Sequence, residues 1–228
     1  MIRFDVLTAV PDFFLSPLNT SILKIASEKN LAEYHIHNLR DYSNNKHKQI
    51  DDKMYGGGAG MVLKPEPFFE CIKKLRSERD YDAIIITDPG GKIYDQKLAV
   101  ELSLKKNIMI LSGHYKGIDN RVKDKFVTDE ISVGNVILTG GEIPALMIID
   151  SVVRLIPGVL HNSESALHDS FQVGNNIEAP CYTRPAEYDG MKVPEVLLKG
   201  NHQEIEKWRQ EQSELRTRIW EKINRMEL

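Results

Sequence analysis

The feature that most restricts the fold of this chain is a regular alternation of short apolar runs with stretches of helical period. Five runs are typical of strands because they are short, rich in β-branched residues and bounded by Gly, Asp, Asn or Pro. They span residues 4–10, 34–39, 83–87, 108–111 and 131–138. Apolar residues recur at helical spacing within 22–26, 68–75 and 98–104. This alternation predicts an α/β fold with a mostly parallel sheet.

The character of the chain changes after this region, which indicates a second domain. Residues 158–180 are rich in Asn, Ser, Gly and Asp, the composition of a linker. Farther on, apolar residues form one helical stripe, with Asn201 and Glu204 placed as a capping box; the stripe is Ile205, Trp208, Leu215, Ile219 and Ile223. We expect an α/β domain over 1–160, a polar and mobile linker over 161–176, and a small helical domain over 177–228.

Composition excludes several classes of protein. The 30 Lys and Arg against 33 Asp and Glu give a net charge of −3, so any nucleic-acid site must be a local patch. Cys71 and Cys181 are the two cysteines, which excludes a disulfide framework and a cysteine-based zinc site. The apolar runs are shorter than the roughly 18 residues that cross a bilayer. We expect a soluble, cytoplasmic protein without a signal sequence.

Three of the expected strands run into glycine at their carboxyl ends. The residues that follow them are Asp-Pro-Gly-Gly (88–91), Ser-Gly-His-Tyr-Lys-Gly (112–117) and Thr-Gly-Gly-Glu (139–142). Ligands of open α/β sheets bind beyond the carboxyl ends of the strands, and glycine lets backbone approach a ligand closely. One such loop indicates only a turn, but three together favour a ligand pocket.

Other motifs are less informative. The glycine run 56–61 lacks the Lys-Ser/Thr ending of a P-loop and the spacing of a dinucleotide site, so a loop over a pocket is the simpler interpretation. His35 and His37 share a strand face without a matching metal ligand. A basic group precedes the glycine run and suits either phosphate contacts or a solvated loop; it comprises Arg40, Lys46, His47, Lys48 and Lys53.

Several sequence motifs, spread over nearly the whole chain, resemble those of the bacterial tRNA (guanine-N1)-methyltransferase family. They include Asp-Lys-Met-Tyr-Gly-Gly-Gly-Ala-Gly-Met (52–61), Glu-Ile-Ser-Val-Gly-Asn (130–135) and Leu-Thr-Gly-Gly-Glu-Ile-Pro-Ala (138–145). Residues 149–160, Asp-Ser-Phe (169–171), Tyr-Thr-Arg-Pro (182–185) and 193–202 complete the set. Any one motif is weak, but together and in this order they are specific.

The resemblance implies a SPOUT-type methyltransferase with a trefoil knot in its first domain and a homodimer whose active site is shared between subunits. Sequence alone argues against a knot, because knots are rare among folds. The resemblance also implies S-adenosylmethionine as methyl donor, with magnesium not evident from the sequence. The residues implied to bind the donor are Pro89, Gly113, Gly117, Val133, Gly134, Asn135, Val136, Ile137, Leu138, Gly140 and Gly141.

The same resemblance implies that Asp169 and Arg154 are catalytic. Asp169 would accept the proton from N1 of the guanine that follows the anticodon (G37), and Arg154 would stabilise charge on its O6. By composition alone both residues are unremarkable, since Asp commonly turns a loop and Arg commonly lies along an apolar helix end. The helical domain would grip the anticodon stem through Lys199, His202, Lys207 and Arg209.

One stretch departs from the family. Its usual Cys-Gly-Arg-Tyr-Glu-Gly is Ser112-Gly113-His114-Tyr115-Lys116-Gly117 here, which puts the contact of the usual Glu with the donor in doubt. Two alternatives stay open. One is a related knotted methyltransferase acting on another RNA position, and the other, indicated only by Lys116, is a non-catalytic RNA-binding module.

Overall fold

The computed structural model describes residues 1–160, 169–172 and 174–225. It divides into two compact units, residues 1–161 and 162–228, which are considered separately below. The predicted linker, 161–176, falls partly on residues 161–168 and 173, which lie outside the described residues.

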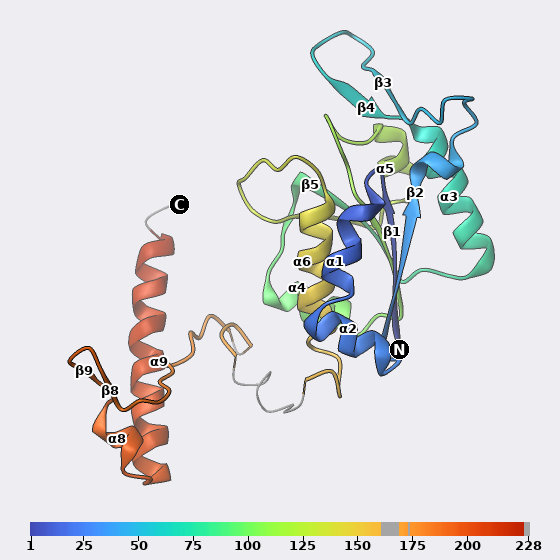
Figure 1. Cartoon of the computed structure of the whole chain (residues 1–228). Coiled ribbons are helices and arrows are strands. Elements are labelled where there is room, and N and C mark those ends of the chain that lie inside the picture. The colour runs from blue at the N-terminus through green and yellow to red at the C-terminus, as the bar shows by residue number, and fades with distance from the viewer. Residues whose placement is uncertain (161–168, 173, 226–228) are drawn as a thin grey trace. The chain divides into compact units, whose positions relative to one another are not determined.

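The first unit is built on a five-stranded sheet in the order β2-β1-β6-β5-β7 (Figure 1). Every neighbouring pair in it is parallel, so the predicted α/β fold with a mostly parallel sheet is confirmed. The strands are β1 (Ile2–Thr8), β2 (Ala32–Asn38), β5 (Ala83–Ile93), β6 (Asn107–Leu111) and β7 (Asp129–Ser132).

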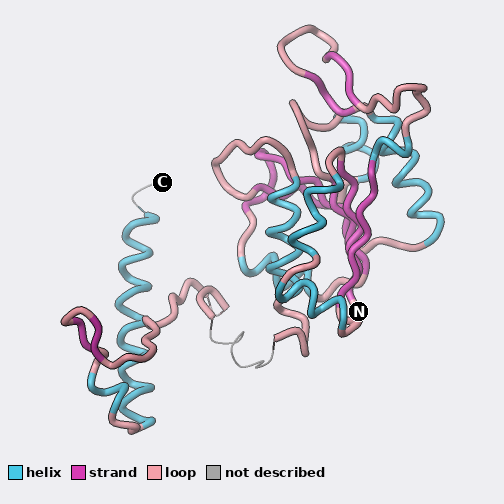
Figure 2. Tube along the Cα trace, in the orientation of Figure 1, coloured by secondary structure: helices cyan, strands magenta, loops and turns pink. Residues whose placement is uncertain are grey.

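Helices cover both faces of this sheet (Figure 2). One side carries η1 (Pro11–Phe14), α1 (Leu15–Leu18), α2 (Ser21–Glu28), α4 (Gln96–Ser103) and α6 (Glu142–Val153). The other carries η2 (Leu39–Tyr42), α3 (Pro65–Glu78) and α5 (Asn120–Phe126). Along β6, Ile108 and Ile110 face the first layer and Met109 and Leu111 the second. Burial on both faces explains why β6 is a continuous apolar run.

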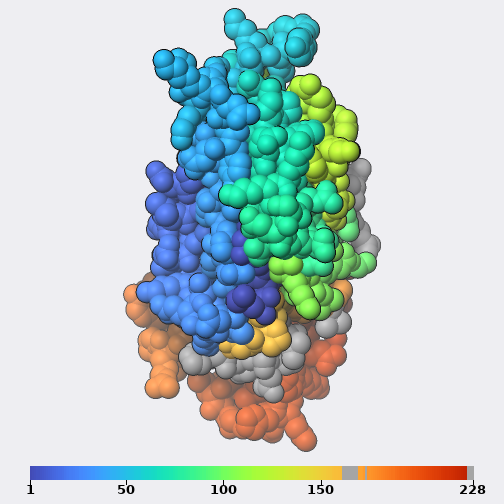
Figure 3. All heavy atoms as spheres, turned by 90° about the vertical axis from the view of Figure 1, so that its right-hand side faces the viewer, coloured from blue at the N-terminus to red at the C-terminus, as the bar shows by residue number. Residues whose placement is uncertain are grey.

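A hairpin projects from this unit (Figures 1 and 3). The sequence pattern predicted only a loop here. Its strands are β3 (Asp51–Lys53) and β4 (Met61–Leu63), which pair antiparallel. The glycine run 56–60 lies between them, and Gly56, Gly57, Gly58 and Gly60 all have positive φ, which glycine adopts without steric cost.

All five predicted strands differ from the structure in at least one end. The strands expected over 4–10 and 34–39 begin two residues earlier and end at Thr8 and Asn38, and the one expected over 108–111 begins at Asn107. The other two differ more. The strand expected over 131–138 ends at Ser132, because Gly134 has φ +119° and Val136 N–H donates to the Gly134 carbonyl in a tight turn. The strand expected over 83–87 continues through the glycines to Ile93, with an irregularity in its pairing with β7 between Thr87 and Lys92.

The second unit contains a hairpin of β8 (Glu187–Tyr188) and β9 (Met191–Lys192), followed by α8 (Glu195–Leu198) and α9 (His202–Arg225). Asn201 precedes α9, and its side-chain oxygen accepts from Gln203 N–H, as an N-cap does. Of the predicted apolar stripe, Ile205 and Trp208 are half-buried, whereas the rest is exposed; Leu215, Ile219 and Ile223 are 48–58% exposed. The stripe predicted for this helix is therefore mostly exposed in the C-terminal half of α9.

Candidate active site

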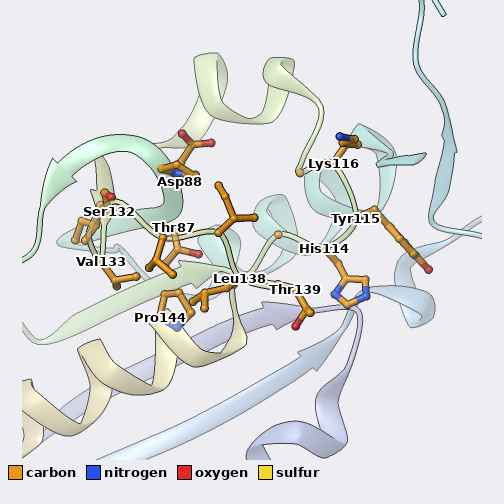
Figure 4. Close-up of a pocket in the computed structure, with 18 of the residues that line it drawn as sticks. Thr87, Asp88, His114, Tyr115, Lys116, Ser132, Val133, Leu138, Thr139 and Pro144 are labelled. Carbon is orange, nitrogen blue, oxygen red and sulfur yellow. The ribbon is translucent and has the colours of Figure 1, made fainter. Parts of the chain in front are cut away.

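The three glycine-bearing strand ends meet at one cavity of about 320 Å³ (Figure 4), a size typical of small-molecule sites. Its walls come from the middle of β5, the loop after β6, the end of β7 and the segment that leads from β7 into α6. Ten of the eleven residues that the family resemblance assigned to the donor line it: Pro89, Gly113, Gly117, Val133, Gly134, Val136, Ile137, Leu138, Gly140 and Gly141. The eleventh, Asn135, is described but is not among the lining residues.

Gly140 and Gly141 are required by the packing of the chain on itself. Gly141 N–H donates to the Gly113 carbonyl at 2.7 Å, and Gly140 forms a bridge with His114. A Cβ on Gly141 would lie 2.5 Å from Thr87 Oγ1 and 2.8 Å from Gly113 N, distances that the neighbouring backbone cannot accommodate. The two glycines thus hold the start of α6 directly against the loop after β6.

Two buried polar side-chain atoms at the cavity make no hydrogen bond to the described residues. Thr87 Oγ1 and His114 Nδ1 are buried and have no hydrogen-bond partner within the described part of the chain, although both residues line the cavity. Glu142, 5% exposed, accepts a hydrogen bond from Thr8 Oγ1 at 2.9 Å and lies 4.0 Å from His114 Nδ1. Because buried polar groups are normally hydrogen-bonded, the arrangement suits a ligand that carries polar groups.

The loop after β6 is tied to the glycine hairpin. Lys116 N–H donates to the Met61 carbonyl, and Leu63 N–H donates to the Gly117 carbonyl, each at 3.0 Å. A Cβ on Gly60 would lie 2.9 Å from Lys116 Cγ, so the stem of Lys116 packs directly on Gly60. The hairpin therefore packs against residues that line the cavity, which agrees with the interpretation of the glycine run as a loop beside a pocket.

The two residues expected to be catalytic belong to different units. Arg154 directly follows α6, is half-buried, and donates its backbone N–H to the Asp150 carbonyl. Asp169 lies in the second unit, is half-buried, and its carbonyl accepts from Gln172 N–H at 3.3 Å.

Several polar residues singled out in the sequence have local partners. His37 Nε2 lies 2.7 Å from Asp5 Oδ1, and His35 Nε2 lies 3.1 Å from Glu33 Oε2. In the basic group, Lys48 pairs with Asp41 at 3.4 Å. In the second unit, Lys199 pairs with Glu195 at 3.1 Å and Arg209 with Glu206 at 2.8 Å; Lys207 and His202 are exposed.

Within residues 1–160, 169–172 and 174–225, no group of three or more His, Cys, Asp and Glu side chains is placed to hold a metal ion. None of the helices that the structure describes has the length and apolar character needed to cross a membrane.

Comparison with known proteins agrees with the motifs. Residues 2–228 match the family described as "tRNA (Guanine-1)-methyltransferase TrmD". Proteins named "tRNA (guanine-N(1)-)-methyltransferase" are similar along their length. The one from Chlorobaculum tepidum is 56% identical over 215 residues, covering 94% of this chain and 93% of the relative. The one from Clostridioides difficile is 51% identical over 213 residues, covering 92% of each. The chain therefore belongs to the tRNA (guanine-1)-methyltransferase family.

Proposed function

We propose that this protein transfers a methyl group from S-adenosylmethionine to N1 of the guanine that follows the anticodon in tRNA (G37). The main support for the proposal is the cavity, because the segments that form its walls contain the family motifs. Family membership over nearly the whole chain supports the same reaction.

The residues around the cavity fit the proposed donor. Ile131, Val133, Leu138 and Pro144 supply apolar surface for a purine ring. Thr87 Oγ1 and His114 Nδ1 are buried polar atoms that make no hydrogen bond to the residues described, and the polar groups of a nucleoside and an amino acid can supply one. S-adenosylmethionine, when bound, supplies an electrophilic methyl group on a positively charged sulfur.

In the proposed mechanism, side chains of this protein accept a proton from the guanine and stabilise the negative charge that develops on it. Guanine N1 carries a proton that must leave before or as N1 attacks the methyl group, so a base is required. Asp169 accepts that proton, and the Arg154 guanidinium stabilises negative charge that develops on O6. The target lies in a single-stranded loop, where a nucleotide can be splayed out of the stack and enclosed.

We infer that the protein works as a homodimer whose active site combines residues of both chains. Exposed apolar side chains on η1, α1 and α6 support this; Phe13, Leu15, Ile143 and Met147 are 41–60% exposed. An apolar groove runs between α2 and α6, lined by Ile22, Leu146 and Met147 among others. Contiguous apolar surface of this kind is typical of a protein interface.

Two further parts of the proposal come from the family. A knotted crossing of the chain in the first unit is expected from the family. The second unit would hold the anticodon stem through phosphate contacts, for which Lys199, His202, Lys207 and Arg209 are the candidates. A cytoplasmic location follows from a tRNA substrate, and a magnesium requirement stays an open prediction.

A transfer assay with labelled S-adenosylmethionine and unmodified tRNA tests the reaction. N1-methylguanine at position 37 is the expected product. Methyl at another position would identify a different RNA methyltransferase, and no transfer would indicate an RNA-binding protein without turnover.

Asp169→Asn tests the proposed base. The change is nearly isosteric, so we expect the fold and the affinity for S-adenosylmethionine to be kept, while methyl transfer falls by roughly 100-fold or more because no group accepts the N1 proton. Calorimetric binding of the donor is the control. Near-normal turnover of this variant would contradict the assignment.

A further inference from the structure

We propose that helix α9 positions the Asp169 carboxylate, and that Trp220 is the main positioning residue. The inference rests on the proposed role of Asp169 as the base. It concerns contacts inside the second unit only, between α9 and the segment that begins at Asp169.

The segment after Asp169 is folded back on itself. Gln172 N–H donates to the Asp169 carbonyl at 3.3 Å, and Phe171 N–H donates to the Asn176 carbonyl at 2.8 Å. Glu178 N–H donates to Ser170 Oγ at 2.9 Å. Asp169 therefore stands at the start of a closed turn, and its direction depends on how that turn is held.

The turn contains a strained residue. Phe171 has φ +68°, a left-handed conformation that a bulky L residue rarely adopts. Such strain persists only where the surroundings enforce it, and it is often found at functional sites. The conformation of Phe171 therefore needs an external support, and Phe171 is only two residues from Asp169.

Helix α9 provides that support through an aromatic contact. The rings of Phe171 and Trp220 meet edge to face, with centroids 5.4 Å apart and planes at 65°, a favourable geometry for two aromatic side chains. Trp220 is half-buried although the apolar residues Ile219 and Ile223 beside it are exposed.

Polar contacts with α9 hold the far end of the same turn. Ile177 N–H donates to Thr217 Oγ1 at 2.9 Å, and Ser213 Oγ donates to the Ile177 carbonyl at 2.6 Å. Arg216 donates from its guanidinium to the Glu178 carbonyl. Ser213, Thr217 and Trp220 are spaced at i, i+4 and i+7, so they share one face of the helix. That face is thus occupied by the segment that carries Asp169.

Loss of the aromatic contact should loosen the turn without removing the base. A less restricted carboxylate spends less time in the orientation that receives the N1 proton, which lowers kcat. The donor cavity lies in the first unit and shares no residue with this turn, so the affinity for S-adenosylmethionine should not change.

The experiment compares Trp220→Ala, Trp220→Phe and Trp208→Ala in the full-length protein with unmodified tRNA. Trp208 is a matched control because it is also on α9 and pairs with another aromatic ring, Tyr182, at 6.2 Å. We expect Trp220→Ala to lower kcat by about tenfold or more, with KM for tRNA and Kd for S-adenosylmethionine changed by less than about threefold. Trp220→Phe keeps an aromatic ring at this position, so it should retain most of the wild-type kcat. Trp208→Ala should keep kcat within about threefold of wild type.

Other outcomes separate this inference from the proposed function. If Asp169→Asn loses turnover but Trp220→Ala keeps it, the positioning role is wrong and the base assignment stands. If Asp169→Asn turns over normally, the base assignment fails and the positioning role fails with it. Should Trp220→Ala unfold, Thr217→Val replaces it, because this change removes the acceptor of Ile177 N–H. A lowered kcat with unchanged KM would then support the inference, and unchanged kcat would overturn it.

Discussion

Asp5 is a fully buried carboxylate in the middle of β1. Burial alone would raise its pKa, but hydrogen bonds from His37, Arg3 and Tyr81, together with the charge of Arg3, hold the pKa of Asp5 well below its usual range. The Arg3 contact is short, with Nε 2.7 Å from Oδ2. The sequence predicted only that His37 lies on a strand. In the structure it is part of a buried polar network. Nothing in the sequence indicated this, because Asp5 and Tyr81 are 76 positions apart.

This network predicts a particular acid sensitivity. Because the folded-state pKa of Asp5 is depressed, the carboxylate stabilises the protein above about pH 4, the ordinary pKa of Asp, and this contribution is lost as the pH falls below that value. Asp5→Asn should lower the free energy of unfolding by about 3 kcal/mol at pH 7, since the half-buried Arg3 would keep only its longer contact with Glu33, at 3.4 Å. It should also flatten the loss of stability between pH 4 and pH 2. Urea unfolding at several pH values measures both effects, and an unchanged acid slope would contradict the prediction.

Lys116 marks the departure from the family at the cavity. Its side chain is exposed, with its stem against Gly60, and an exposed charge acts weakly through water. We expect Lys116→Glu to change the free energy of S-adenosylmethionine binding by about 1 kcal/mol or less, measured by calorimetry. If the substitution abolishes binding, the lysine has a specific role and the assignment of this loop to the donor is wrong.

At the scale of elements, the sequence predicted where strands lie better than where they end. The runs at 83–87 and 108–111 are apolar on both faces, and β5 and β6 contain them. The run at 131–138 is also rich in apolar residues, yet β7 stops at Ser132, and Val136 and Ile137 are exposed at the cavity. Apolar composition cannot distinguish a core strand from a segment that faces a ligand or a partner, because both are apolar for reasons that depend on the tertiary structure.

Gly90 and Gly91 are neighbours with very different surroundings, a difference that the sequence does not indicate. A Cβ on Gly91 would lie 2.5 Å from the Glu130 carbonyl carbon and 2.6 Å from Ile131 N, whereas a Cβ on Gly90 would meet only Asp88 Oδ1 at 3.2 Å. We expect Gly91→Ala to destabilise the protein by about 3 kcal/mol or more, because β7 backbone must move. Gly90→Ala, the control, should cost about 1 kcal/mol or less. Thermal unfolding measures the difference, and equal effects would show that β5 and β7 do not pass this closely.

At the scale of the whole molecule, the sequence patterns predicted a parallel α/β sheet and a ligand pocket at its glycine-bearing strand ends. The assignment of that pocket to a methyl donor needed the family motifs, since a fold does not determine a reaction. The contacts that join distant segments, such as Lys116 with Met61 and Gly141 with Gly113, have no local sequence signal. They depend on which loops the sheet order brings together.

The apolar surface of the first unit leads to the last prediction, which concerns assembly. Ile143 and Met147 on α6, with Phe13 and Leu15 on η1 and α1, expose apolar side chains near the groove between α2 and α6. If a second copy covers this surface, Ile143→Asp would bury an unpaired carboxylate in the interface, which is strongly unfavourable.

We therefore expect Ile143→Asp to shift the protein from dimer to monomer in analytical ultracentrifugation, and methyl transfer to fall by about tenfold or more because an active site shared between two chains is lost. The thermal midpoint of the isolated chain should change little, since Ile143 is 51% exposed within it. Leu104→Asp is the control, because Leu104 is also an exposed apolar residue, 83% accessible at the end of α4, and this change should leave both dimer and activity intact. A wild-type protein that is monomeric and fully active at nanomolar concentration would show that each chain holds a complete active site, and the shared-site proposal would then be wrong.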